Sequence, residues 1–221
     1  MNFTIASAIG LIAAFVISLV HLLVCRPWRF APAKCKPDVP RYGVIELLVH
    51  LGLAAGFLGL MVTSFYPVLT GQPLHGYLLM AHVGLSPVFY FSLLGALMVW
   101  GEDCCFSKAD CDWVSHRLKN PLGDPAGSPK TGRFDPLQKG FLWLSGVLGF
   151  ILLVTMLLSM VPLFGTYGQE LLLTLHRGAA LALFMLTIFH GYRTVLGKPR
   201  GWTSLITGKV SRAWMEKYSP E

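Results

Sequence analysis

Two histidines stand in a long apolar segment near the C-terminal end of the chain. In LLLTLHRGAALALFMLTIFHGYR, residues 171–193, they are His176 and His190. Their separation is almost four helical turns, so the imidazoles would share a face to within about 40° and lie about 21 Å apart along the axis. Neutral imidazole is a strong axial ligand for haem iron, but it also forms ordinary hydrogen bonds between helices.

The elements that must hold these histidines are membrane-spanning helices. Of 221 residues, 54% are hydrophobic and only 13% are charged, whereas soluble domains carry about a quarter charged residues. Five segments are apolar over the roughly 20 residues that a bilayer core requires. They are residues 3–25, 43–64, 74–100, 137–163 and 168–196. We therefore predict an all-α integral membrane protein with five transmembrane helices.

The basic residues predict the orientation of these helices. Nearly every Lys and Arg lies in the 26–42 loop, the 101–139 loop or the tail after Tyr192, whereas the connections 65–73 and 162–169 carry none. By the positive-inside rule, the N-terminus is outside and the C-terminus is in the cytoplasm. A lipid bilayer thus accounts for the net charge of +7, and no nucleic acid partner is needed.

Short outer connections place the later four spans in two antiparallel hairpins. We expect an added N-terminal helix, a first hairpin, a cytoplasmic linker, a second hairpin and a cytoplasmic tail. These parts are residues 1–25, 43–100, 101–136, 137–196 and 197–221. The linker is predicted to be flexible because NPLGDPAGSP lies in its middle. The first span has no basic segment before it, so we interpret it as a retained helix rather than a signal peptide.

Two further histidines match the first two in depth. His82 lies as far from the outer side as His176, and His50 lies near the level of His190 on the inner side. Ionisable residues at membrane depth suggest function by default. We predict two bis-histidyl haem b groups, an outer one on His82 and His176 and an inner one on His50 and His190. The alternative is four structural histidines that bond neighbouring helices.

Several glycines lie near these histidines. Gly84 and Gly178 each follow a predicted ligand by two residues, where a missing side chain would let a flat ring approach. In the second span, Gly52, Gly56 and Gly59 include a G-x-x-x-G motif. Helix packing explains that motif as well as a haem pocket does.

Other polar residues leave alternatives open. Arg177 is the only Lys or Arg in the outer half of the membrane, and we predict that it binds a haem propionate. An ion pair with Glu170 is the alternative. His75 lies at the outer end of the third span, seven residues before His82, and is expected at the membrane surface. It is the alternative ligand to His82. His21 and His116 have no partner at matching depth and remain unassigned.

The five cysteines do not form a recognisable cofactor motif. Cys25 ends the first span, and the others lie on predicted cytoplasmic loops at Cys35, Cys104, Cys105 and Cys111. No C-x-x-C-H motif is present, which excludes covalently attached haem. A reducing cytoplasm argues against disulfides, and C-C-x5-C is not a standard spacing for zinc or an iron–sulfur cluster. We predict free thiols, with a metal site as the alternative.

Three stretches resemble a known family. They are the H-x13-H pair, GRFDPLQKG at the start of the fourth span, and the tail GKVSRAWMEKYSP. Over about residues 43–221 the chain resembles the di-haem cytochrome b membrane (gamma) subunit of respiratory formate dehydrogenases and related quinone-linked oxidoreductases. The resemblance implies a four-helix haem bundle in the bacterial inner membrane, to which this chain adds one helix. It places the haem ligands at His50, His82, His176 and His190.

The same resemblance implies a quinone site beside the inner haem. Asp135, Gln138 and Lys139 are polar groups at the start of the fourth span, and we predict that they contact quinone. The family pattern Arg-Tyr-Asn-x-Gly-Gln-Lys is changed here, since Asp135 replaces Asn and Leu137 replaces Gly. The alternative for Asp135 is an ordinary N-cap with Pro136 at the first helical position.

These features predict an electron-transfer subunit without catalytic residues of its own. It would link the quinone pool, near the inner haem, to a partner subunit that carries an iron–sulfur cluster or a cytochrome. The alternative from another class is a haem-free membrane anchor or transporter in which the histidines relay protons. The outer and inner histidines are separated by about 21 Å of hydrocarbon side chains, and this separation argues against a relay. A stand-alone transmembrane reductase is a third possibility, against which the tail argues because its family counterpart touches partner subunits.

Overall fold

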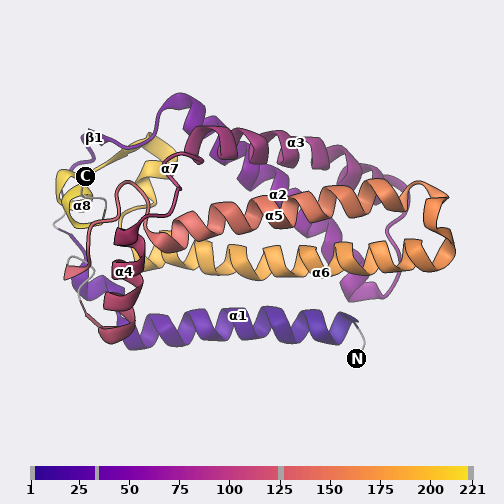
Figure 1. Ribbon diagram of the computed structural model, residues 1–221, viewed down its shortest axis with the longest axis horizontal. Coiled ribbons are helices and arrows are strands. Elements are labelled where there is room, and N and C mark those ends of the chain that lie inside the picture. The colour runs from indigo at the N-terminus through magenta and orange to yellow at the C-terminus, as the bar shows by residue number, and fades with distance from the viewer. Residues whose placement is uncertain (1–2, 33–34, 124–126, 219–221) are drawn as a thin grey trace.

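Five long helices run along the molecule, each long and apolar enough to cross a membrane (Figure 1). They are α1 (Phe3–Cys25), α2 (Val44–Thr70), α3 (Gly76–Trp100), α5 (Pro136–Ser159) and α6 (Gly165–Tyr192). The computed structural model describes residues 3–32, 35–123 and 127–218. The predicted fold class is confirmed. The second span is longer than expected, because α2 accommodates Pro67 and ends only at Gly71, whose φ is 68°.

Side chains at the helix starts explain where two of these helices begin. The Glu46 carboxylate accepts a hydrogen bond from the backbone N–H of Gly43 (2.7 Å) at the start of α2. At the start of α5, the Asp135 carboxylate accepts from the N–H groups of Leu137 and Gln138 (both 3.0 Å). Asp135 is therefore the N-cap, as the sequence alternative held, and such a cap stabilises a helix by about 1 kcal/mol.

The helices pack as two hairpins, α2 with α3 and α5 with α6. Small residues bring the first pair close together, since a Cβ atom added at Gly56 would lie 2.8 Å from the backbone nitrogen of Phe89. A Cβ at Gly59 would lie 2.6 Å from the Leu85 side chain. The glycine motif of the second span thus serves helix packing.

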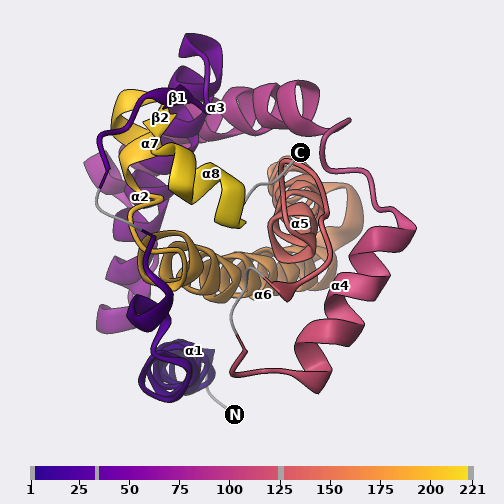
Figure 2. The same ribbon diagram turned by 90° about the vertical axis from the view of Figure 1, so that its left-hand side faces the viewer.

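The two hairpins meet through α3 and α5, and α1 lies along α6 on the outside of the bundle (Figures 1 and 2). Between α2 and α6 the contact is made by aromatic rings, with the Phe184 ring 5.6 Å from Phe57 and 5.4 Å from Phe65. A hydrophobic core of five buried side chains fills the middle of the bundle. These are Phe89, Leu93, Leu152, Ala179 and Leu183.

The remaining elements gather at one end of the bundle (Figure 1). They are η1 (Pro27–Phe30), β1 (Val39–Pro40), α4 (Lys108–Lys119), the π-helical turn η4 (Arg193–Gly197), α7 (Thr203–Thr207), β2 (Lys209–Val210) and α8 (Arg212–Tyr218). The short 3-10 turn η3 (Pro162–Phe164) joins α5 to α6 instead. The tail folds back on the chain, because β2 pairs antiparallel with β1 and Val210 is fully buried.

The 101–136 segment contains regular structure that the sequence prediction did not include. It contains α4, whose start is fixed by hydrogen bonds from the N–H and hydroxyl groups of Ser107 to the Asp110 carboxylate (2.7 and 3.0 Å). The same carboxylate forms a buried ion pair with Lys139 of α5 (2.9 Å). Only part of the Gly- and Pro-rich stretch lies within the described residues, since 124–126 fall outside them.

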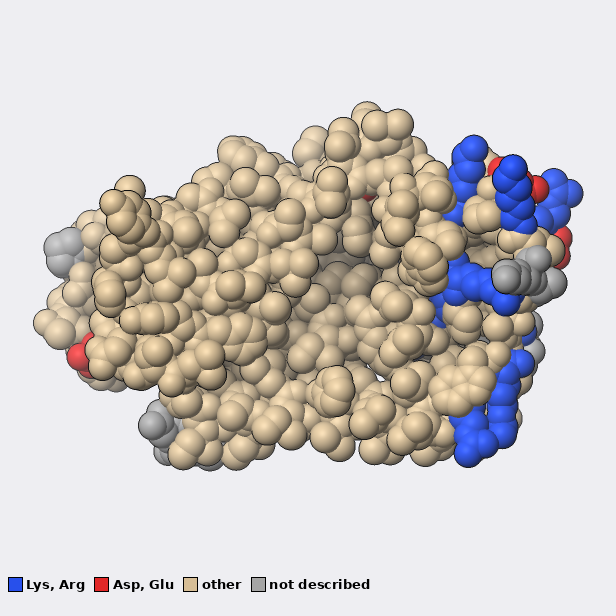
Figure 3. Space-filling view, turned by 180° about the vertical axis from the view of Figure 1, so that it is seen from behind, with Lys and Arg blue, Asp and Glu red and all other residues tan. Residues whose placement is uncertain are grey.

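Charge is unevenly distributed along the molecule. On the face drawn in Figure 3, Lys and Arg side chains gather at the end that carries α4 and the tail, and the long middle is uncharged. Large apolar side chains are exposed along the helices, including Phe15, Phe91 and Phe150. A belt of exposed apolar side chains, with most Lys and Arg residues at one end, is typical of a protein that spans a bilayer.

Candidate haem ligands and an inner cavity

The four predicted ligands lie on three helices: His50 on α2, His82 on α3, and both His176 and His190 on α6. All four are partly buried. His82 and His176 are close enough to interact electrostatically, and so are His50 and His190. The structure therefore brings the imidazoles together in the two pairs that helix depth predicted. Their role as haem ligands stays a prediction.

Hydrogen bonds fix the ring orientation of the outer pair. Nδ1 of His176 lies 3.1 Å from the carbonyl oxygen of Leu152, so this nitrogen carries the proton and donates. Nδ1 of His82 lies 2.8 Å from the Thr63 hydroxyl. That hydroxyl already donates to the carbonyls of Gly59 and Leu60 (3.0 and 2.9 Å), so it accepts from His82. In both rings the lone pair is on Nε2, and anchoring of the other nitrogen is typical of metal-ligating histidines.

The donor set thus fits an axially ligated haem at the outer level, although the glycines do not help in the way expected. Gly84 and Gly178 are exposed, and two helical positions correspond to a rotation of about 200°. Each glycine therefore points away from the histidine that precedes it. The expectation that they make room for the ring is wrong, because it considered sequence distance without the helical rotation.

The inner pair has a different environment. The ring of His190 stacks on Phe141, with centroids 3.8 Å apart and an interplanar angle of 15°. The ring of His50 lies 6.4 Å from that of Trp100. The structure records no hydrogen bond from a described residue to either imidazole, so their tautomers are not fixed by the polypeptide. His190 also lines a cavity.

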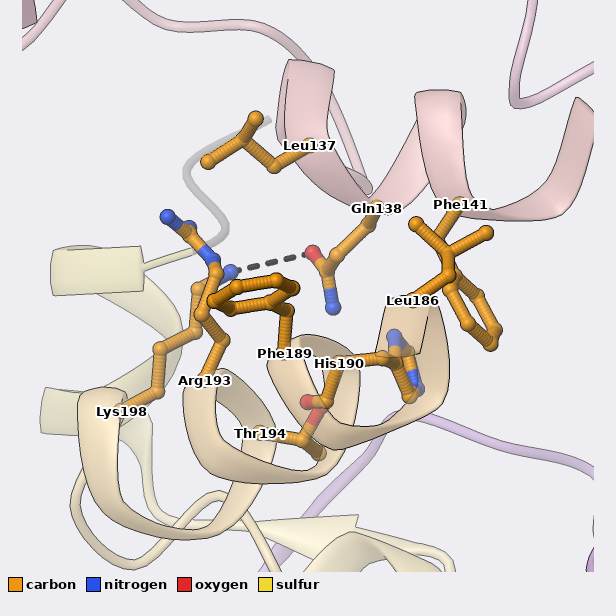
Figure 4. Close-up of a pocket in the computed structure, with 9 residues that line it drawn as sticks. All are labelled: Leu137, Gln138, Phe141, Leu186, Phe189, His190, Arg193, Thr194 and Lys198. Atoms are coloured by element: carbon orange, nitrogen blue, oxygen red, sulfur yellow. Dashed lines mark hydrogen bonds between the residues drawn. The ribbon is translucent and has the colours of Figure 1, made fainter. Parts of the chain in front are cut away.

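This inner cavity has a volume of about 340 Å³ and lies between the start of α5 and the end of α6 (Figure 4). Its wall is mainly apolar with a few convergent polar groups, a combination typical of small-molecule sites. The lining residues are Leu137, Gln138, Phe141, Leu186, Phe189, His190, Arg193, Thr194 and Lys198. Within it, the Lys198 ammonium donates a hydrogen bond to the side-chain oxygen of Gln138 (3.0 Å).

The three residues predicted to contact quinone take different positions. Gln138 lines the cavity. Asp135 lies beside it, and its carboxylate forms ion pairs with two lining residues, Arg193 (2.9 Å) and Lys198 (2.8 Å). Lys139 does not line the cavity, because its buried ammonium is held by Asp110 and by the carbonyl of Cys105 (3.1 Å) on the side facing α4.

The ion pairs decide the charge state of Asp135. Burial opposes its ionisation, but the Arg193 guanidinium and the Lys198 ammonium hold the pKa of this carboxyl far below its usual range. Asp135 therefore stays ionised at any physiological pH. It positions the two cations at the cavity and is unsuited to take up and release protons.

Arg193 and Lys198 are functional candidates that sequence reasoning missed. Both follow the last apolar run, where basic residues are expected for topology alone. The GRFDPLQKG motif also gains a structural meaning. Arg133 forms ion pairs with Glu46 (2.5 Å) and Asp103 (2.9 Å), which ties the start of α2 to the segment that leads into α5.

Arg177 is exposed on the outer part of α6. Within the described residues it forms no ion pair, so the alternative partner Glu170 is not engaged. Binding of a haem propionate by Arg177 remains a prediction. His75 stands at the N-cap position of α3, with its ring 6.0 Å from that of Tyr66. His21, by contrast, lies 2.5 Å from the Tyr192 hydroxyl across the α1–α6 contact.

The five cysteines form no disulfide with one another. Across residues 3–32, 35–123 and 127–218 there is no cluster of three or more His, Cys, Asp and Glu residues that could hold a metal ion. The alternative of a cysteine metal site thus gains no support. Cys104 is only 2% exposed. Burial, together with the nearby Asp103 carboxylate, raises the pKa of its thiol to about 11.

Comparisons with known proteins agree with the motifs. No family model matches the chain. The chain is 25% identical over 171 residues to the cytochrome b556(Fdn) subunit of the nitrate-inducible formate dehydrogenase of Escherichia coli K12, and equally similar to that of Escherichia coli O157:H7 and of Shigella flexneri. The match covers 72% of this chain and 76% of the relative. The chain thus has five candidate membrane spans and is similar to the cytochrome b556 subunits of these formate dehydrogenases.

Proposed function

We propose that this protein is a di-haem cytochrome b subunit that carries electrons across the membrane between a partner redox subunit and quinone. The observation that carries the proposal is the pairing of four intramembrane histidines at two levels. In the outer pair, both rings are anchored through Nδ1, so Nε2 is free to ligate. Histidines with only a structural role would not need to lie in pairs at the same depth, nor to leave Nε2 without a hydrogen bond as the outer pair does.

The ligands would be His82 and His176 for the outer haem and His50 and His190 for the inner haem. A haem held between two imidazoles supplies a reversible one-electron centre. The polypeptide anchors the outer imidazoles through Thr63 and the Leu152 carbonyl and surrounds them with hydrocarbon side chains. Hydrogen bonds of this kind at Nδ1 keep the ligating nitrogen, Nε2, directed at the metal.

Quinone would bind in the inner cavity, where an apolar head group would contact Phe141 and Phe189. Gln138, Arg193 and Lys198 offer hydrogen-bond donors to its carbonyl oxygens. Asp135 keeps the two cations in place. The proximity of His190 to this cavity supports quinone exchange at the inner rather than the outer level.

The partner would be an iron–sulfur or cytochrome subunit of a larger complex, by analogy with the relative, which is a subunit of formate dehydrogenase. We place the end that carries α4 and the tail in the cytoplasm, because most Lys and Arg residues lie there. Electrons entering at the outer haem would then reach quinone near the cytoplasmic surface, where water can supply protons.

The test is haem content with optical spectroscopy of the purified protein. We expect two b-type haems per chain, both six-coordinate and low-spin. His82→Ala or His176→Ala should remove one spectral component, and His50→Ala or His190→Ala should remove the other. His75→Ala, which changes a histidine at the start of α3 outside both pairs, is the matched control and should retain both haems.

The outcomes separate this proposal from the haem-free alternative. A protein without a Soret band after expression in haem-replete cells would contradict the proposal and favour an anchor or transporter. Loss of the same component in His82→Ala and His190→Ala would show that the pairing is wrong. For the quinone site, Gln138→Leu should slow quinone-dependent oxidation of the reduced haems while both remain bound, and an unchanged rate would contradict that assignment.

A further inference from the structure

A second cavity lies at the inner end of the molecule, beside the added helix. It has a volume of about 430 Å³ and is enclosed by α1, α4, the end of α6 and the tail. In Figure 2, α1 and α4 flank the end of α6 that closes this space. Unlike the inner cavity, it is lined by many polar and ionisable groups. They include His21, Cys25, His116, Asp135, Arg193 and Lys198.

The two cavities share part of their walls. Arg193 and Lys198 line both of them. Asp135, which is ion-paired to both cations, lines the second cavity. Water in the second cavity therefore meets the inner cavity at a polar boundary and not across a layer of hydrocarbon. Such a boundary can pass protons, provided that a group which titrates near neutral pH stands on the water side.

Two of the three residues at this boundary cannot be that group. Asp135 is held ionised, and arginine stays protonated at all accessible pH values. The third, Lys198, is held by the Asp135 carboxylate and the Gln138 side chain. Histidine is the side chain whose ordinary pKa lies in the right range. His21 contacts the residue next to this boundary, because its Nδ1 is 2.5 Å from the hydroxyl of Tyr192, which precedes Arg193.

The surroundings of His21 are defined on each side. From its own helix, Cys25 Sγ lies 3.3 Å from Nε2. From α6 and η4, Tyr192 and Arg193 face it, and from α4 the Arg117 guanidinium acts on it electrostatically. None of these direct contacts is a carboxylate. Asp135 and Glu216 line the same cavity, but Asp135 is already paired with Arg193 and Lys198, and no contact between Glu216 and the imidazole is recorded among the described residues. His21 can therefore both gain and release a proton.

We propose that His21 of the added helix is the residue that takes up protons from inner-side water and passes them toward quinone in the inner cavity. This rests on the proposed quinone chemistry. Conversion of one quinone to quinol requires two electrons, which the haem side supplies, and two protons. Each proton is taken from water by His21 and released toward the cavity, so the imidazole returns to its neutral form each time. The added helix thus completes the site on its water side.

Water access to the second cavity is tested without reference to activity. In a variant with Cys35, Cys105 and Cys111 replaced by Ser, a charged membrane-impermeant thiol reagent added to inside-out vesicles should modify Cys25. The buried Cys104 in the same molecule serves as the control and should stay unmodified. A Cys25 that reacts only after denaturation would overturn the proposal, because the cavity would then not admit water.

The role of His21 is tested by proton uptake during quinone reduction, followed with a pH indicator across pH 6–9. His21→Gln should slow proton uptake about tenfold or more, as loss of a positioned acid–base group does. Added imidazole should restore the rate, which it would not do if His21 were only structural. His75→Gln, at the other end of the bundle, is the matched control and should behave as wild type.

Each result decides one question. Wild-type protein that exchanges no electrons with quinone would contradict the proposed function itself. A working wild type whose His21→Gln variant matches it at every pH, or is slowed without rescue by imidazole, would overturn the role of His21 alone. If His21→Gln fails to fold, alkylation of Cys25 in the folded wild type provides the same test. A bulky group 3.3 Å from His21 Nε2 should block uptake, and an unaffected rate would contradict the proposal.

Discussion

Replacing Asp135 by asparagine separates two roles that this residue combines. Its carboxylate caps α5 through two hydrogen bonds of 3.0 Å and also pairs with Arg193 and Lys198. Asparagine caps helices as well as aspartate does, so Asp135→Asn retains the cap and removes only the charge. Asp135→Ala removes both. The difference between the two variants therefore measures the cap, and Asp135→Asn alone measures the ion pairs.

The structure sets the size of the effect. The side chains of Asp135 and Lys198 are only 7% and 11% exposed, and loss of one partner of a buried pair costs about 3–5 kcal/mol. For a chain of this size, that corresponds to a fall in Tm of roughly 6–20 °C. Asp135→Ala should be less stable than Asp135→Asn by about 1 kcal/mol. Since the pKa of Asp135 is depressed, its contribution is present at all pH values above about 4 and is lost only in stronger acid.

Thermal unfolding in detergent at pH 5–8 measures these differences. Asp112→Asn, which changes an exposed acid of α4, is the matched control and should fall within about 0.5 kcal/mol of wild type. Asp135→Asn with Lys198→Met should be more stable than Asp135→Asn alone, because removal of both buried charges leaves only the partly exposed Arg193 unpaired. An Asp135→Asn variant as stable as wild type, or a double variant with merely additive losses, would refute the reasoning.

Two further predictions concern packing and thiol chemistry. Gly56→Ala should lower the free energy of unfolding by about 1–3 kcal/mol, because the added Cβ would lie 2.8 Å from the Phe89 backbone. Gly84→Ala is the control, since its Cβ would meet nothing within 4 Å, and it should not lower stability. Comparison of the two unfolding midpoints checks this prediction. At pH 8 the Cys104 thiol is three units below its pKa of about 11, so about one in a thousand is ionised. Peptide mapping after thiol alkylation should find exposed Cys105 modified and Cys104 intact, and fast reaction of Cys104 would contradict the buried placement.

The spans and the depth pairing of the histidines were accessible from the sequence because both follow from single-helix geometry. A bilayer sets the length of an apolar run, and the helical rise places His176 and His190 at two levels. The same geometry explains the error at Gly84 and Gly178. The depth of a residue in the membrane follows from the rise per residue, but the direction in which it points follows from the rotation of about 100° per residue. This rotation turns both glycines away from the histidines that precede them.

The ion-paired cluster could not be predicted because it joins segments that only the tertiary fold brings together. Asp135 begins one hairpin helix, while Arg193 and Lys198 follow the end of the next. The helix α4 is a different case, since a local signal was present. Ser107 and Asp110 stand in the spacing of a capping box, which outweighs the turn-forming residues that follow it.

The ion-paired cluster also supports the proposal that quinone binds at the inner end. Two cations and one carboxylate leave the rim of the inner cavity with one net positive charge next to His190, in a largely apolar wall. A positive potential in a poorly solvated site favours the negative charge that develops on quinone oxygens as electrons arrive. The family pattern has asparagine at this position. In this chain, an asparagine here would leave the charges of Arg193 and Lys198 uncompensated and costly to bury. In the proposed site, the aspartate would thus leave a net positive charge that favours electron transfer to quinone, while its ion pairs let the helix ends pack.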